Sequence, residues 1–218
     1  MASRGRQAEP RRPVPRLYLV TPRDPAGLAH LMAQSLAAAD VAAVLLRLPD
    51  AGPEQQINHV RALAPAVQDQ GVALLLDGHP HLAASAGADG AHLDGVDALK
   101  AALSQLKPER IAGCGGLASR HDAMVAGEAG ADYVMFGEPS MDGERPSFDA
   151  ISERIAWWAE LFEIPCVGFA GTLDEVEPLA AAGADFIAVG EAVFTDRRGC
   201  GAAVAEAAQR LQVAETLA

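Results

Sequence analysis

The sequence predicts an α/β fold, a single-domain (β/α)8 TIM barrel, from a repeated stretch and from the alternation of strands and helices around it. Ala-Gly-Ala-Asp followed by an apolar run occurs at 86–93, 129–136 and 182–189, and a weaker copy covers 37–46. The copies recur about every 50 residues, enough for two strand–helix pairs, so four copies give eight pairs. The chain has 218 residues, half of them hydrophobic, which suits one such domain.

Uninterrupted apolar runs of strand length alternate with amphipathic segments, as expected for buried parallel strands joined by helices. The strands are expected at 16–20, 41–47, 72–76, 90–93, 110–113, 133–136, 165–169 and 186–189. The first helix is expected to begin at 24 or 25, the second to end near 70, and the third to end near 86. The later helices are expected at 97–106, 119–129, 147–162, 173–182 and 202–213. Ser119 is a plausible N-cap.

Four aspartates open the even-numbered strands: Asp40, Asp89, Asp132 and Asp185. In this architecture they lie at the N-terminal ends of the strands, the face where recurring residues serve stability. We therefore expect them to be structural, and we expect the chemistry at the opposite ends of the same strands.

The composition limits the classes of partner that this protein is expected to bind. A formal net charge of −12 argues against a general nucleic-acid or anionic-membrane surface. No apolar run is long enough to span a bilayer. The three cysteines are scattered and show no metal-type spacing, which suits a reducing, cytoplasmic setting.

The chain ends differ from the predicted barrel domain at 16–213. Residues 1–15 are rich in Arg and Pro and contain no apolar signal-peptide core, so a disordered N-terminal tail is expected. Residues 214–218 are expected to form a C-terminal tail.

Candidate functional residues follow the strands, where such barrels place catalysis. The ionisable ones are Arg47, Asp77, His79, His81, Asp94, Asp97, Glu138 and Glu191. Glycines after strands 7 and 8, Gly171 and Gly190, fit turns whose N–H groups hold a phosphate, although glycine is common at any tight turn. Cys114 lies at a strand end, and the sequence fixes no histidine beside it.

A divalent metal is a second possibility at these loops. Asp94 and Asp97 could bind Mg²⁺ with Asp77, whose carboxylate oxygens suit that ion. The alternative, weighed equally, is that Asp97 only caps the following helix. Asp77 with His79 or His81 is a weaker metal pattern, because spacing specifies no third ligand.

Five motifs together resemble the thiamine phosphate synthase family and its relative, the thiazole tautomerase family. LYLVT at 17–21 resembles the opening LYLVTD, and GADGAHLDGVD at 87–97 resembles GADGVHLGQxD. GADYVMFGEPS at 130–140 resembles GADYVGFGPxF, and GADFIAVGEAV at 183–193 resembles GADGVAVxSAI. Residues 164–172 resemble PVVAIGGI, so the likeness covers almost the whole predicted domain.

The resemblance implies a reaction and its groups. The family joins a pyrimidine-methyl diphosphate to a thiazole phosphate and expels pyrophosphate, with Mg²⁺, an Arg and two Lys around the departing group. Carried over by motif, Arg47, Asp77 and Arg145 are catalytic, and Asp77 and Asp97 hold Mg²⁺. Phosphate binding falls to Arg47, Gly115, Gly171 and Gly190.

Several motif positions depart from the family. In QLRxK, Arg47 is kept, but the Gln is Leu45 and the Lys is Pro49. The strand-6 loop lacks the Lys of TxTK, and Arg145 is the partial substitute. Because Glu138 and Glu191 also add negative charge, weak or lost synthase activity is expected; a carboxylate ~4 Å from a phosphate costs about 4 kcal/mol at an effective dielectric near 20.

Alternative functions remain open at this stage. A barrel of the same superfamily could instead bind or isomerise a small molecule, act in regulation, or serve as a structural partner of another enzyme. For an enzyme or a small-molecule binding protein, the expected ligand is a pyrimidine or thiazole compound.

The sequence is also compatible with a homodimer.

Overall fold

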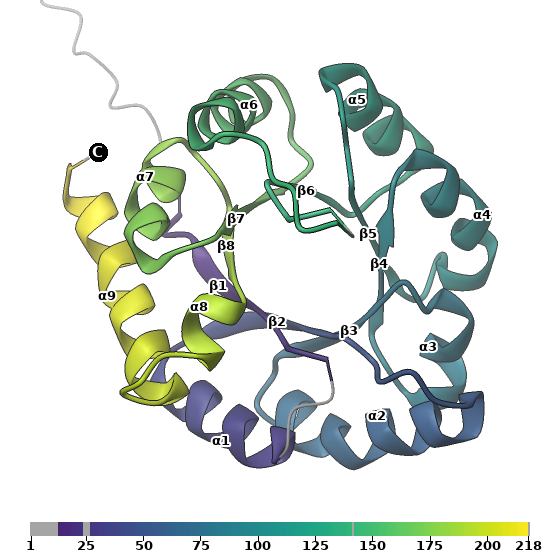
Figure 1. The fold of residues 1–218 in the computed structure, drawn as a ribbon. Coiled ribbons are helices and arrows are strands. Elements are labelled where there is room, and N and C mark those ends of the chain that lie inside the picture. Colours follow the sequence, from purple (N-terminus) through teal and green to yellow (C-terminus); the bar gives the residue numbers. More distant parts are fainter. Residues whose placement is uncertain (1–12, 24–26, 141, 218) are drawn as a thin grey trace, which may run out of the picture.

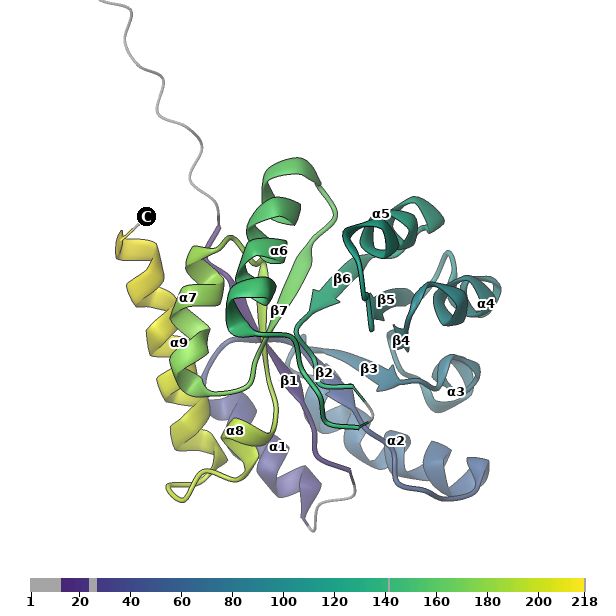
Figure 2. The same ribbon diagram turned by 45° about the horizontal axis from the view of Figure 1, so that its top comes forward.

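The computed structural model describes residues 13–23, 27–140 and 142–217, with side chains up to Val213. Eight parallel strands close into a barrel in the order β1 to β8, and helices form a ring around it (Figure 1). The predicted (β/α)8 architecture is therefore confirmed. The same ring is visible obliquely in Figure 2, where the loop between β6 and α6 reaches toward the barrel axis.

The elements follow one another as strand and helix around the ring. The strands are β1 (Arg16–Val20), β2 (Val41–Leu46), β3 (Ala73–Asp77), β4 (Gly90–Asp94), β5 (Ile111–Gly115), β6 (Tyr133–Phe136), β7 (Cys166–Ala170) and β8 (Phe186–Val189). The helices are α1 (Leu28–Ala38), α2 (Pro53–Gln68), α3 (Pro80–Ala86), α4 (Val96–Leu106), α5 (Arg120–Ala129), α6 (Phe148–Leu161), α7 (Val176–Ala181), α8 (Glu191–Phe194) and α9 (Cys200–Leu217), with the 3-10 turn η1 (Leu173–Glu175) before α7.

Several boundaries differ from the sequence-based expectation. β5 continues to Gly115, because its N–H and C=O groups stay in register with β4 up to the pair Asp94–Gly115. The expected helix at 173–182 is divided into η1 and α7, and the short α8 was not expected. The last helix begins at Cys200 and continues to Leu217, through most of the segment expected as a C-terminal tail.

Two predictions concern segments that the structure describes only in part. The expected N-terminal tail lies outside the described residues except for 13–15. The expected start of the first helix, at residue 24 or 25, also lies outside them, and the described helix begins at Leu28 after Gly27. Among the helices of the described part, none combines the length and apolar character needed to cross a membrane.

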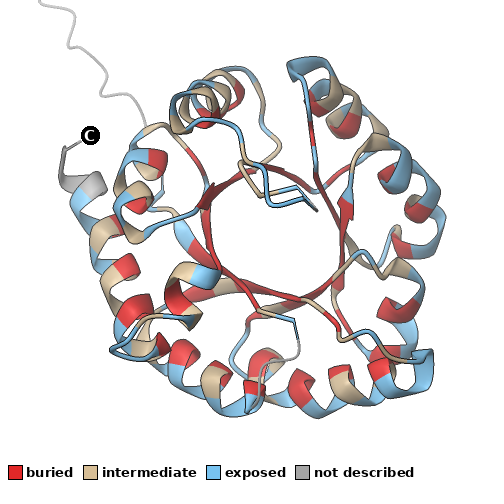
Figure 3. Cartoon of the chain, viewed as in Figure 1, coloured by how far each residue is buried: buried red, intermediate tan, exposed pale blue. Residues whose placement is uncertain are grey.

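The core has two layers separated by the strands. One cluster packs the outer strand faces against the helices, and a second fills the barrel interior with Tyr18, Leu45, Leu75, Tyr133 and Phe169 among its members. Figure 3 shows this as a buried inner ring with exposed residues toward the outside. Side chains of this second cluster thus occupy much of the interior, and a cavity of about 190 Å³ lies among residues that include Tyr18, Leu75 and Tyr133.

The repeated aspartates open the even strands, as the sequence predicts, and the structure shows that they bond to the N-terminal ends of the preceding odd strands. Asp89 Oδ2 accepts the N–H of Leu74 at 2.7 Å, and Asp185 Oδ2 accepts the N–H of Cys166 at 2.8 Å. Asp132 accepts the N–H of Ala112 at 2.7 Å. Each carboxylate thereby satisfies a strand N–H at the barrel rim and joins two neighbouring strands.

Asp40, the first of the four aspartates, bonds to a side chain of β1 instead of a backbone N–H. Asp40 pairs with Arg16, the first residue of β1, through Oδ1 at 2.8 Å and Oδ2 at 2.9 Å. This pairing lowers the pKa of Asp40, chiefly through the hydrogen bonds from Arg16. All four aspartates therefore tie the start of an even strand to the start of the preceding odd strand.

Replacing Asp89 with alanine is expected to lower the free energy of unfolding by about 1–3 kcal/mol, because the buried N–H of Leu74 loses its acceptor. Urea unfolding of the two proteins measures the difference. Glu160→Ala, at an exposed position of α6, is the control and should stay within about 0.5 kcal/mol of the parent. Equal losses in both variants would contradict a structural role for Asp89.

Candidate functional site

Arg47 emerges at the C-terminal end of β2 and points toward β3. Its Nε lies 3.2 Å from Oδ2 of Asp77, the last residue of β3. Its backbone N–H donates to Oγ1 of Thr21 at 3.0 Å, and Thr21 is fully buried after β1. Within the described residues neither terminal nitrogen of Arg47 has a hydrogen-bond partner, so the guanidinium is held in place yet keeps donors for a ligand.

A chain of hydrogen-bonded side chains crosses the barrel interior beneath Arg47. The hydroxyl groups of Tyr18 and Tyr133 lie 2.8 Å apart, and Tyr133 Oη lies 2.9 Å from Nδ1 of His92. All three side chains are buried. Burial raises the pKa of both tyrosines, so the pair stays neutral over the physiological range.

Glu138 closes this chain from above and points inward. Its Oε1 accepts the N–H of Gly116 at 2.8 Å and lies 3.6 Å from Nε2 of His92. Its Oε2 is buried and has no hydrogen-bond partner among the described residues. A carboxylate with an unsatisfied buried oxygen can accept a hydrogen bond from a ligand.

The absence of a side chain at Gly115 makes room for this carboxylate. A Cβ built there would lie 2.6 Å from His92 Nε2 and closer still to Oε1 of Glu138. Gly115 lies inside β5, with its neighbours in register against β4. The predicted phosphate-binding glycine is therefore a position that admits Glu138.

Arg145 lies at the other side of the mouth and is compensated by Glu175. Its NH1 donates to Glu175 Oε1 at 3.0 Å, and its NH2 lies 2.7 Å from Glu175 Oε2. Arg145 also donates to the carbonyl oxygens of Gly137, at 2.6 Å, and of Phe169. The N–H of Gly171 donates to Glu175 Oε2 at 2.8 Å, so the two expected anion-binding groups already share an internal carboxylate.

The remaining expected glycine and its neighbour lie at the end of β8. Gly190 precedes the single turn of α8, and its carbonyl oxygen accepts the N–H of Val193 at 3.0 Å. The side chain of Glu191, the first residue of α8, is exposed. Of the two glutamates expected near the mouth, Glu138 is thus directed inward and Glu191 lies at the surface.

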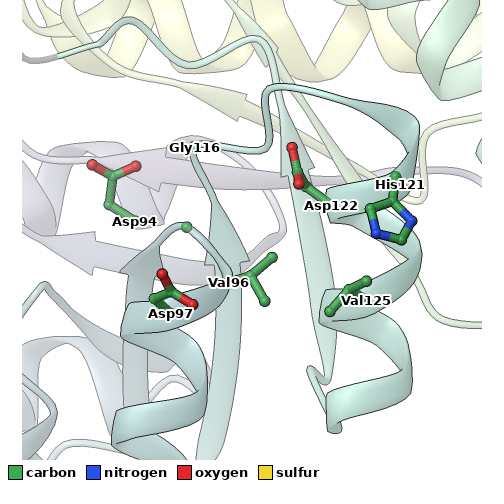
Figure 4. A pocket seen from close by; sticks show the side chains of 8 residues that line it. Asp94, Val96, Asp97, Gly116, His121, Asp122 and Val125 are labelled. Atoms are coloured by element: carbon green, nitrogen blue, oxygen red, sulfur yellow. The ribbon is translucent and has the colours of Figure 1, made fainter.

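Asp94 and Asp97 line a groove of about 410 Å³ between α4 and α5. Figure 4 shows both carboxylates on one wall, with His121 and Asp122 of α5 on the other. The N-cap of α4 is Gly95 and Asp97 makes no capping hydrogen bond, so the capping alternative for Asp97 is wrong.

The carboxylates present the right atoms for Mg²⁺ but are few. The described residues contain no group of three His, Cys, Asp or Glu side chains that could hold a metal. Asp77 is engaged by Arg47, and Asp97 lies in the groove with Asp94. Mg²⁺ shared with a diphosphate usually takes one or two carboxylates from the protein, and Asp77 and Asp97 supply ligands of that chemical type.

The structure reveals two features that sequence reasoning missed. Glu175 was expected only as part of a helix, although an acidic residue four positions after the turn glycine Gly171 was a usable signal. The contact between Tyr18 and Tyr133 joins residues 115 apart in the chain. A tyrosine within each of two apolar strands was the available sign of an interior polar pair.

Cys114 is buried within β5, and its thiol is expected to be unreactive. Burial raises its pKa to about 12, with the charges of Glu138 and Asp94 acting in the same direction. Because so high a pKa leaves a very small thiolate fraction near neutral pH, native Cys114 should be alkylated at least on the order of 10²-fold more slowly at pH 8 than the same thiol in unfolded protein. Mass spectrometry of native and denatured protein measures the two rates; similar rates in both would contradict this expectation.

Gly115→Ala is expected to displace Glu138 from Gly116, because the added methyl group overlaps Oε1. The loss of stability should be about 1–3 kcal/mol and should shrink in a Glu138→Ala background. A double-mutant cycle by urea unfolding measures this coupling. Gly52→Ala is the matched control, since a Cβ there meets nothing within 4 Å; additive effects of the Gly115 and Glu138 changes would contradict the packing described.

The chain is similar to known proteins over almost its whole length. The family model described as thiamine monophosphate synthase matches residues 17–193. The thiamine-phosphate synthase of Rhodospirillum centenum is 44% identical over 196 residues, covering 88% of this chain and 95% of that protein. That of Hyphomonas neptunium is 38% identical, covering 90% and 93%.

A solved structure supports the same fold. The thiamine phosphate pyrophosphorylase from Pyrococcus furiosus superposes with a TM-score of 0.76 at 21% identity, covering 91% of this chain and 96% of that one. At that identity the likeness shows the barrel alone, whereas the family follows from the sequence matches. The chain belongs to the thiamine monophosphate synthase family.

Proposed function

We propose that the protein catalyses the coupling step of a thiamine phosphate synthase, with low turnover. In this reaction the C–O bond of a pyrimidine-methyl diphosphate breaks, and the thiazole nitrogen forms the new C–N bond to the methylene carbon. Pyrophosphate leaves with the oxygen. Family membership and the Arg47–Asp77 pair at the barrel mouth support this assignment.

Arg47 is the main cationic group for the leaving pyrophosphate in this proposal. Its Nε is anchored by Asp77, and its side chain is 31% exposed, so the terminal nitrogens can reach a ligand. Positive charge placed where negative charge develops accelerates the bond-breaking step. Asp77 acts by orienting the guanidinium.

Mg²⁺ belongs to the same proposal as a cofactor. Asp77 and Asp97 would hold it, and when bound it supplies positive charge beside the diphosphate. The chain's own contribution is to orient Arg47 and to exclude water from the packed interior below the mouth. The expected partners are small molecules, and the scattered cysteines support a cytoplasmic location.

Low turnover follows from the charge balance of the mouth. Arg47 and Arg145 are each paired with a carboxylate, and Glu138 directs a further carboxylate inward. Loss of one stabilising donor typically lowers a rate by roughly 10²–10³. With both family lysines replaced, the local field is much weaker than the reaction needs.

One observation favours a second candidate, a barrel that binds or isomerises a heterocycle without coupling it. Glu138 lies beside His92, and its buried Oε2 accepts no hydrogen bond from the described residues. An aminated ring could donate to it without carrying a phosphate.

We expect the purified protein with Mg²⁺, the pyrimidine diphosphate and the thiazole phosphate to form thiamine phosphate at well below about 1 s⁻¹. Arg47→Met should lower this rate by roughly 10²–10³, because the leaving group loses its cation. Chromatographic measurement of thiamine phosphate over several hours detects turnover this slow.

Arg61→Met is the control, since Arg61 binds the carbonyl oxygen of Ser85 on the outer helices. Turnover on the order of 10 s⁻¹ would overturn the argument from charge. Absence of product with the parent protein, at any substrate concentration, would overturn the synthase assignment and favour the binding alternative.

A further inference from the structure

The barrel interior contains a cavity at the end opposite to Arg47. Its volume is about 190 Å³, and side chains of β1, β2, β3 and β5 to β8 line it. Ala73, Ile111 and Phe186 are lining residues that begin their strands, and each of them is only partly buried. The cavity therefore opens at the N-terminal face of the barrel, away from the pair formed by Arg47 and Asp77.

Three alanines leave the space that larger side chains would fill. Bulky branched residues dominate the interior layers of such barrels. Here Ala43 of β2 pairs in register with Ala73 of β3, and both line the cavity. The register between β1 and β2 shifts by one residue at this level, so Ala42 has no partner on β1, and it lines the cavity as well. The volume thus follows from small side chains on two neighbouring strands.

Two tyrosines bound the cavity toward the mouth, and hydrogen bonds hold both. The hydroxyl of Tyr133 lies 2.8 Å from that of Tyr18 and 2.9 Å from Nδ1 of His92. The ring of Tyr133 lies over Gly113, where an added Cβ would be 2.0 Å from Cζ of the ring. Burial raises the pKa of both tyrosines, so their hydroxyls are neutral. The rings therefore form a fixed and uncharged wall.

The polar groups around the cavity are bound to other parts of the protein. At the opening, the guanidinium of Arg16 donates to Asp40 at 2.8 and 2.9 Å and to the carbonyl oxygen of Val41 at 3.2 Å. The buried side-chain atoms that lack a partner in the described part of the chain all belong to residues outside this lining. A molecule inside would thus meet aliphatic and aromatic walls without a free buried polar group.

We propose that this cavity is a binding site for one small, uncharged, apolar molecule about the size of a single aromatic ring. An apolar protein cavity of about 150 Å³ stays dry and binds benzene, because water inside it would lose hydrogen bonds. A cavity of about 190 Å³ has room for one such ring. Transfer of the ring from water into these walls drives binding. The site is separate from the barrel mouth and does not rest on the proposed function.

Benzene is the probe, and the full chain with labelled alanine methyl groups reports where it binds. Saturable binding with a Kd of about 1 mM or tighter is expected, with intermolecular NOEs from benzene to the methyl groups of Ala43 and Ala73. Benzoate has the same ring with a charge. It should bind at least about tenfold more weakly, because its carboxylate would lose hydration without gaining a buried partner.

Two substitutions fill the cavity from different strands. Ala43→Leu and Ala73→Leu should each weaken benzene binding at least about tenfold, because the added carbons occupy the space of the ring. Ala62→Leu is the matched control, since Ala62 is exposed on α2. This variant should bind benzene as the parent does.

Absence of saturable binding to the parent, or NOEs that come only from other alanines, would overturn the proposal. Folded Ala43→Leu and Ala73→Leu variants that both bind benzene as tightly as the parent would overturn it as well. Benzoate that binds as tightly as benzene would contradict the uncharged class of ligand. The NOE measurement needs only the parent protein, so it decides the location even where a leucine variant fails to fold.

Discussion

Carboxylates that accept backbone N–H groups hold the strands of this barrel at both of their ends. At the N-terminal rim, Asp89, Asp132 and Asp185 each accept the N–H of a residue on the preceding odd strand. At the C-terminal rim, Glu138 accepts the N–H of Gly116 and Glu175 that of Gly171. A strand terminus that is screened from water requires such a partner, because an unsatisfied buried N–H costs about 1–3 kcal/mol.

The two rims use this interaction with different consequences. At the N-terminal rim the carboxylates stabilise the closed sheet and leave the chemistry untouched. At the C-terminal rim Glu138 and Glu175 occupy the N–H groups of Gly116 and Gly171, and Glu175 also compensates the charge of Arg145. At this rim the loop N–H groups therefore donate to carboxylates of the protein itself.

The packed interior transmits this arrangement across the mouth. Tyr18, Tyr133 and His92 form one hydrogen-bonded chain that ends close to Glu138. Glycine at position 115 is needed because any larger residue would collide with His92 and Glu138. A side chain added at Gly115 on β5 would therefore displace Glu138 on the loop after β6.

The sequence by itself determined the barrel, the eight strands and the structural aspartates, because repeat spacing, apolar runs and turn glycines are local signals. It also placed Arg47 and Asp77 at the same rim, since both follow strands directly. Only the tertiary structure decided the directions of Glu138 and Glu175. A glutamate side chain has several rotamers of similar energy, and its choice depends on partners such as Arg145, 30 residues away from Glu175 in the chain, that folding brings beside it.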